Sequence, residues 1–134
     1  MMQFVEPIIG GLAAFALGFL WYTALFGKAW QAETGISDAE AQKDMARTHG
    51  LALLMMIIMS YAVNIIIGFH PVEEQTFLHG ALHGAIMGIF YTATSTAINY
   101  LYQRKSLKLF LIDATYQVLL LALSGGVMAA LKLA

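Results

Sequence analysis

The sequence predicts an all-α, polytopic membrane protein in which four transmembrane helices form an antiparallel bundle. Hydrophobic residues make up 60% of the chain and charged residues only 11%, whereas soluble domains are roughly half apolar and about a quarter charged. The apolar residues gather into long runs that reach the roughly 20 residues needed to cross a bilayer as a helix. Because the chain has 134 residues, we expect a single transmembrane domain over residues 1–134.

The apolar runs predict four helices, at residues about 5–26, 50–69, 77–101 and 109–131. Pro7 is compatible with the first helix, because the N–H groups of a first turn have no partner within the helix. The main polar segment separates the first two helices. In it, Ser37 is followed three residues later by Glu40, and this spacing predicts a capping box that starts a short interfacial helix.

Glycines in two of the predicted helices are spaced for close packing. Small residues repeated on one helix face let a second backbone approach closely. We therefore expect this surface either to hold another helix of the chain or to drive self-association. The packing glycines are Gly11 and Gly18 in the first helix and Gly80, Gly84 and Gly88 in the third. Further along the third helix, regular α-helical spacing places Asn99 on the sector of Gly88.

Lys and Arg residues are distributed unequally between the two sides of the predicted bundle. Lys132 lies on the side of the two termini, and the other six lie in loops 28–49 and 103–108, as Lys28, Lys43, Arg47, Arg104, Lys105 and Lys108. Because cytoplasmic loops carry the excess of basic residues, we expect a multi-pass protein of the inner (plasma) membrane. Both basic loops are then cytoplasmic, and both termini lie outside.

A polar cluster is predicted inside the membrane, about 8–10 Å from the cytoplasmic ends of the helices at 1.5 Å per residue. Its members are Trp21, Tyr22, Lys28, Asn99, Asp113, Tyr116 and Gln117. Asp113 is the centre, because a carboxylate within a spanning helix is costly and is usually paired or functional. Two roles stay open: a hydrogen-bonded lock between helices, or a carboxylate that handles a proton or a cation.

A second polar layer is predicted toward the opposite side of the membrane. His79 and His83 are four residues apart, which is the spacing of a metal-binding pair on one helix face. A metal site needs at least a third ligand. The alternatives are a pH-sensitive or solute-contacting pair, or histidines hydrogen-bonded at a helix interface. Other polar residues expected nearby are Glu6, Asn64, His70, Glu73, Glu74 and Ser124.

Composition and motifs exclude several functional classes. The absence of cysteine removes disulfides, thiol nucleophiles and thiolate metal sites. The net charge of −1 lacks the clustered basic surface of a nucleic-acid-binding protein. The sequence holds neither a phosphate-binding loop nor a catalytic triad pattern. We therefore predict no catalytic residues and no particular cofactor, and expect the lipid bilayer, a second copy, and a small solute or ion as partners.

Two sequence blocks resemble the signature segments of a bacterial family of small membrane proteins known as domain of unknown function 1761. They are WYTALFGKAW at residues 21–30 and NYLYQRKSLKLFLIDATYQ at residues 99–117. The resemblance implies four spans and supplies no activity. The resemblance directs attention to its motif positions, which coincide with the predicted polar layer near the cytoplasmic side: Trp21, Tyr22, Gly27, Lys28, Trp30, Asn99, Lys108, Asp113 and Tyr116. His79 and His83 lie outside these motifs.

Three functional hypotheses follow from the sequence. The first is a small homo-oligomeric transport or channel-like protein with Asp113 at its cytoplasmic mouth. The second is a structural scaffold or lipid-binding module in which Asp113 only locks helices together. The third, which the sequence favours least, is a metal-dependent membrane enzyme that uses His79 and His83.

Overall fold

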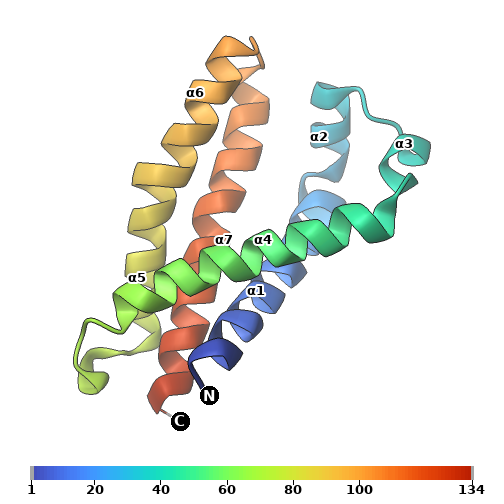
Figure 1. The fold of residues 1–134 in the computed structure, drawn as a ribbon. Helices are drawn as coiled ribbons and strands as arrows, with labels where there is room; N and C mark the ends of the chain where they lie inside the picture. Colours follow the sequence, from blue (N-terminus) through green and yellow to red (C-terminus); the bar gives the residue numbers. More distant parts are fainter. Residues whose placement is uncertain (1, 134) are drawn as a thin grey trace.

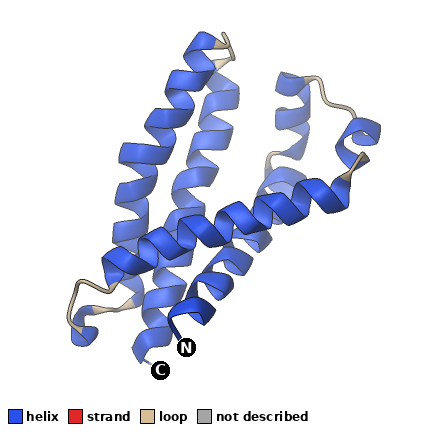
Figure 2. Cartoon of the chain, viewed as in Figure 1, coloured by secondary structure: helices blue, strands red, loops and turns tan. Residues whose placement is uncertain are grey.

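The computed structural model describes residues 2–133, and this part of the chain contains helices and turns without a strand (Figure 2). The all-α prediction is therefore confirmed. Along the chain, three α-helices precede the long helix α4, and three follow it. Two π-helical turns and a 3₁₀ turn lie among them. The elements are α1 (Met2–Leu20), the π-helical turn η1 (Trp21–Leu25), α2 (Gly27–Thr34), α3 (Asp38–Gln42), α4 (Met45–Ile67), the 3₁₀ turn η2 (Val72–Glu74), α5 (Phe77–Met87), the π-helical turn η3 (Gly88–Ala93), α6 (Thr94–Tyr102) and α7 (Leu107–Leu133).

Helix α7 is the helix around which the others pack. It contacts α5, η3 and α6 along one side and α1 and α4 along another, and α4 crosses α1 and α7 steeply (Figure 1). Half of the most apolar 18-residue stretch of α7 is buried inside the protein, against 28% for the corresponding stretch that begins in α1 and 22% for that of α4. The outer faces of α1 and α4 are thus apolar and exposed, as expected for helices that face lipid.

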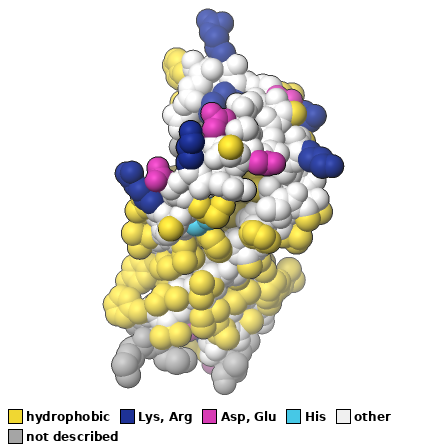
Figure 3. Space-filling model, turned by 90° about the vertical axis from the view of Figure 1, so that its right-hand side faces the viewer, with side chains coloured by type: hydrophobic (Ala, Val, Ile, Leu, Met, Phe, Trp, Pro, Cys, Tyr) yellow, Lys and Arg dark blue, Asp and Glu magenta, His cyan; other side chains and the backbone are white. Residues whose placement is uncertain are grey.

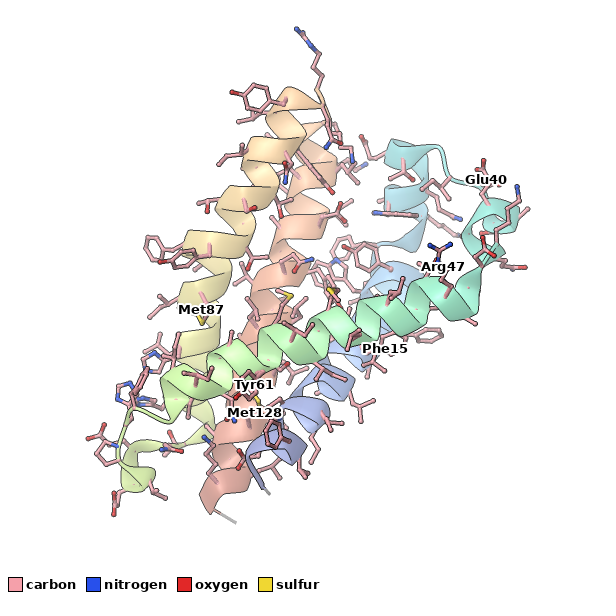
Figure 4. The ribbon with its side chains drawn as sticks, in the orientation of Figure 1. Phe15, Glu40, Arg47, Tyr61, Met87 and Met128 are labelled. Atoms are coloured by element: carbon pink, nitrogen blue, oxygen red, sulfur yellow. The ribbon has the colours of Figure 1, made fainter. Side chains whose placement is uncertain are left out.

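The core lies where α1, α4 and α7 meet. Met128 of α7 is fully buried there, together with Val63 and Ile67 of α4 and Ala14 of α1. Figure 4 shows Met128 among the side chains between α1 and α4. Gly10 of α1 makes room for it, because an added Cβ would lie 3.1 Å from the Met128 side chain.

The two ends of the molecule differ in charge. The chain termini and the α4–α5 connection lie at one end, while α2, α3 and the α6–α7 turn lie at the other (Figure 1). Figure 3 shows Lys, Arg, Asp and Glu side chains gathered toward the end of α2 and α3, above a band of hydrophobic side chains. We call this the basic end, because it carries Lys28, Lys43, Arg47, Arg104, Lys105 and Lys108. The opposite end is called the histidine end.

Three helical stretches are long and apolar enough to cross a membrane: Phe4–Leu25, Met45–Ile67 and Leu107–Lys132. The fourth expected span, residues 77–101, is divided at η3 into α5 and α6, each shorter than a span. The three pieces follow one another directly and lie along α7 as one rod (Figure 1). The four-helix prediction is therefore supported for three spans, and the fourth remains part of the proposal below.

The connection between α1 and α4 contains more helix than expected. Ser37 and Glu40 form the predicted capping box at the start of α3, and Gly35 ends α2 in a left-handed conformation with φ of 72°. Helix α2 itself was not expected. Helix α4 starts at Met45 rather than near residue 50, because Asp44, with φ of 49°, turns the chain directly into it.

Candidate functional site

Asp113 lies on α7 toward the basic end, and two tyrosines from other segments hold its carboxylate. The Tyr22 hydroxyl, from η1, donates a hydrogen bond to Oδ1 at 2.6 Å. The Tyr100 hydroxyl, from α6, donates to Oδ2. Each carboxylate oxygen therefore has its own donor, and the three side chains connect η1, α6 and α7. We call these three residues the Asp113 site.

Aromatic residues next to this site fix η1 and α1 against α7. The Trp21 indole Nε1 donates a hydrogen bond to the carbonyl of Ile112 at 3.1 Å. The Tyr116 hydroxyl donates to the carbonyl of Ala14 at 2.9 Å. The rings of Tyr22 and Tyr116 pack edge to face with centroids 5.1 Å apart. These long-range contacts hold the Tyr22 hydroxyl at the carboxylate.

The carboxylate of Asp113 is held by neutral donors. In the part of the chain that the structure describes, the two ion pairs join His70 to Glu74 and Lys132 to Glu6. Lys105 lies over the Tyr100 ring, with its Nζ 4.5 Å from the ring centroid, and forms no ion pair with Asp113. The two hydroxyls satisfy both carboxylate oxygens, but within the described residues no Lys, Arg or His side chain forms an ion pair with Asp113.

The two π-helical turns determine which residues reach Asp113. A π-helical turn closes from i to i+5 and so contains one residue more than an α-helical turn. In η1, Phe26 N–H bonds to the carbonyl of Trp21 at 2.8 Å in this way. The extra residue in η3 shifts the helical register of α6 by one residue relative to α5. As a result Tyr100, rather than the predicted Asn99, faces α7, and Asn99 is exposed.

A one-residue deletion tests this register. We expect deletion of Phe90, an exposed residue of η3, to convert the π-helical turn into an α-helical one while keeping Tyr100 opposite Asp113. The variant should purify as a monodisperse, helical protein with a melting temperature close to that of the parent. Deleting the exposed Leu119 from the regular helix α7 is the matched control, and it should prevent folding because it rotates the rest of α7 by about 100°. Loss of folding in both variants would contradict the register argument.

The structure unites only part of the predicted intramembrane cluster. Trp21, Tyr22, Asp113 and Tyr116 come together, and Trp30 packs edge to face on Tyr22 with centroids 5.9 Å apart. Lys28, Asn99 and Lys108 are exposed, and Gln117 is half-buried without a hydrogen bond to the site. Tyr100 was missed. The first tyrosine of NYLY was a visible signal, but its orientation depends on the π-helical turn.

All five predicted packing glycines face a helix of the same chain. Gly80, Gly84 and Gly88 lie against the backbone of α7, where a Cβ at Gly84 would collide with the carbonyl oxygen of Leu121. Gly11 faces Ile57 of α4, and Gly18 faces the hydroxyl of Tyr116. Gly27 is also required, because a Cβ there would lie 2.6 Å from the Tyr22 carbonyl oxygen. These surfaces are filled within the chain and do not by themselves offer a site for a second copy.

At the histidine end, three histidines converge. The Nε2 atoms of His79 and His83, one turn apart on α5, are 2.9 Å from each other. His70, from the α4–α5 connection, completes a group in which one ring nitrogen of each residue lies within 4.8 Å of the others. All three side chains are partly buried. We call these residues the histidine cluster.

Other polar residues toward this end form two separate groups between α1, α4 and α7. Asn64 donates a hydrogen bond to the Glu6 carboxylate at 3.3 Å, and Lys132 lies 4.0 Å from the same oxygen. Ser60 donates to Ser124 at 3.0 Å. The single outer layer expected from the sequence is therefore divided, because the histidines lie on the α5 side of the bundle.

The structure is that of an all-α protein with apolar helices of membrane-spanning length. Between its helices lies the Asp113 carboxylate, and the histidine cluster lies at the opposite end. The chain belongs to the family described as Protein of unknown function (DUF1761), whose profile matches residues 6–129. The resemblance seen in the WY, FGK and NYLY segments is thus confirmed. No curated protein and no solved structure matches the chain.

Proposed function

We propose that this chain is a small inner-membrane protein that crosses the bilayer four times and takes up a proton or a monovalent cation at Asp113, as part of a homo-oligomeric transport or channel-like assembly. In this proposal both termini are outside, and the basic loops 28–49 and 103–108 are cytoplasmic. One observation carries it: the carboxylate of Asp113 lies in an apolar span and is bound by two hydroxyls without a cationic partner.

The chemistry of the Asp113 site supports uptake of a positive charge. An uncompensated carboxylate in a low-dielectric span is strongly unfavourable unless it binds a proton or a cation. The two carboxylate oxygens and the oxygens of Tyr22 and Tyr100 also form a set of hard ligands suitable for a small monovalent cation. The location near the basic end places this group within reach of the aqueous phase on that side.

An assembly of several copies is proposed because one copy is thin. A surface groove with a volume of about 540 Å³ lies between α2 and α7 on the outside of the bundle, and it does not pass through the bundle. A continuous polar path through the membrane would therefore have to be enclosed by more than one chain. The exposed apolar faces of α1 and α4 are the surfaces available for such contacts.

Proton flux into liposomes tests the proposal. We expect purified protein to support ion- or pH-dependent flux, and Asp113→Asn to remain folded but to abolish it, because an amide cannot take up a proton or balance a cation. Asp38→Asn, at an exposed carboxylate of α3, is the control and should keep the flux. Unchanged flux in Asp113→Asn would contradict the proposal. Native mass spectrometry of the same samples should show an oligomer, and a monomer would contradict the assembly.

A second candidate, a scaffold or lipid-binding module, is favoured by the groove between α2 and α7. Its lining includes Trp21, Phe26, Leu111 and Ile112, together with Lys108. Apolar walls beside a cation suit an acyl chain with an anionic headgroup. In this case Asp113 serves only as a lock, the liposomes show no flux, and native mass spectrometry detects a retained lipid.

A further inference from the structure

A hydrogen bond between two histidines does not explain why all three residues of the histidine cluster lie together. A shared proton accounts for the 2.9 Å separation of the His79 and His83 nitrogens. It does not account for His70, whose ring centroid lies 4.5 Å from that of His79 and 4.6 Å from that of His83. Three imidazoles with ring nitrogens within 4.8 Å of one another can supply the ligands of a transition-metal ion.

Neighbouring residues hold the cluster in place from two directions. The Gln75 side chain, which is buried, donates a hydrogen bond to the His70 carbonyl at 2.6 Å. The next residue, Thr76, caps α5 and accepts a hydrogen bond from the His79 N–H at 3.3 Å. One short segment therefore sets the position of His70 relative to α5, so that a loop histidine and a helical pair are brought together reproducibly.

The surroundings favour a cation on the nitrogens. The α4–α5 connection carries Glu73 and Glu74 and contains neither Lys nor Arg, so its potential is negative. Glu74 lies 3.8 Å from Nδ1 of His70. A small movement of the Glu74 side chain would let its carboxylate accept a hydrogen bond from Nδ1, which orients the ring of a ligand histidine and leaves Nε2 for the metal.

We propose that His70, His79 and His83 bind a divalent transition-metal ion of the Zn²⁺ class, with Glu74 orienting His70. Imidazole ligands suit Zn²⁺, Co²⁺, Ni²⁺ and Cu²⁺, whereas Mg²⁺ and Ca²⁺ prefer oxygen. Ligand nitrogens about 2.0–2.1 Å from a tetrahedral Zn²⁺ lie about 3.3 Å from one another, so the Nε2 atoms of His79 and His83, which are 2.9 Å apart, would separate slightly on binding. The described residues supply three ligands, so the fourth position is open to water or an exchangeable ligand.

Titration of tag-free protein in nanodiscs with Zn²⁺ tests this site. We expect one Zn²⁺ per chain with micromolar or tighter affinity. Loss of a ligand in His70→Ala should weaken binding by about 100-fold, and Glu74→Gln by about tenfold. His49→Ala is the matched control, because His49 is the one histidine of the chain outside the cluster and packs on Phe15. Excess Mg²⁺ should not compete.

Three results would overturn the proposal: no binding by the parent protein, unchanged affinity in His70→Ala, or an equal loss in His49→Ala. If a histidine variant fails to fold, X-ray absorption of the Zn²⁺-loaded parent decides, since it must show about three imidazole ligands. The site is independent of the function proposed for Asp113. Asp113→Asn should bind Zn²⁺ as the parent does, so the failure of one proposal leaves the other standing.

Discussion

Gly84→Leu is expected to prevent the chain from folding. A Cβ at Gly84 would collide with the carbonyl oxygen of Leu121 and lie 2.9 Å from the backbone nitrogen of Ala122. Backbone atoms cannot rotate away as a flexible side chain can, so α5 would have to separate from α7, the helix against which it is packed. We expect a loss of more than about 3 kcal/mol in the free energy of unfolding, measured by SDS titration in micelles.

Gly50→Leu is the control for this substitution. Gly50 is also helical, but an added Cβ there has no atom within 4 Å. The same change of residue should therefore be neutral or slightly stabilising, because Leu favours helix over Gly by somewhat less than about 1 kcal/mol. A Gly84→Leu protein as stable as Gly50→Leu would show that α5 and α7 are not in close contact.

Tyr22→Phe is expected to destabilise the protein by about 1.5–3 kcal/mol, the range for a hydrogen bond to a charged group. The substitution leaves Oδ1 of Asp113 without its donor. In an Asp113→Ala background the same change should cost little, because no carboxylate remains to be satisfied. The difference between the two costs, measured by SDS titration as a double-mutant cycle, gives the coupling energy.

Tyr91→Phe serves as the matched control for this cycle, because Tyr91 is 75% exposed. Its cost should stay within about 0.5 kcal/mol in both backgrounds. A coupling energy near zero between Tyr22 and Asp113 would contradict the hydrogen bond. A large coupling energy shows that η1 and α7 are joined through this carboxylate, whether or not it also takes up a charge.

Much of the architecture could be predicted because it depends on local sequence. Apolar runs gave the helices, and the spacing of Ser37 and Glu40 gave the cap of α3. Asp113 was recognised because a carboxylate in an apolar run is conspicuous by itself, and Tyr22 because it lies at a matching depth.

What could not be predicted depends on register and on long-range placement. Tyr100 replaced Asn99 because η3 contains an extra residue, and a regular helical period cannot reveal it. His70 was only expected to be near His79 and His83, because its position is set by the conformation of a loop and by the Gln75 side chain. The spacing of Gly80, Gly84 and Gly88 did not identify the helix that packs on them, and only the fold shows that this helix is α7.

The central position of α7 has a consequence for how the protein is made. Along the chain, α7 follows every helix that it joins, so α1, α4 and the α5–α6 rod leave the ribosome before their main partner has been synthesised. Until α7 has been synthesised, Gly80, Gly84 and Gly88 of α5 lack the backbone against which they pack, and Tyr22 and Tyr100 have no carboxylate to bind. Assembly of the helices is therefore a late event in biosynthesis, because the last helix of the chain supplies the surface on which the earlier ones pack.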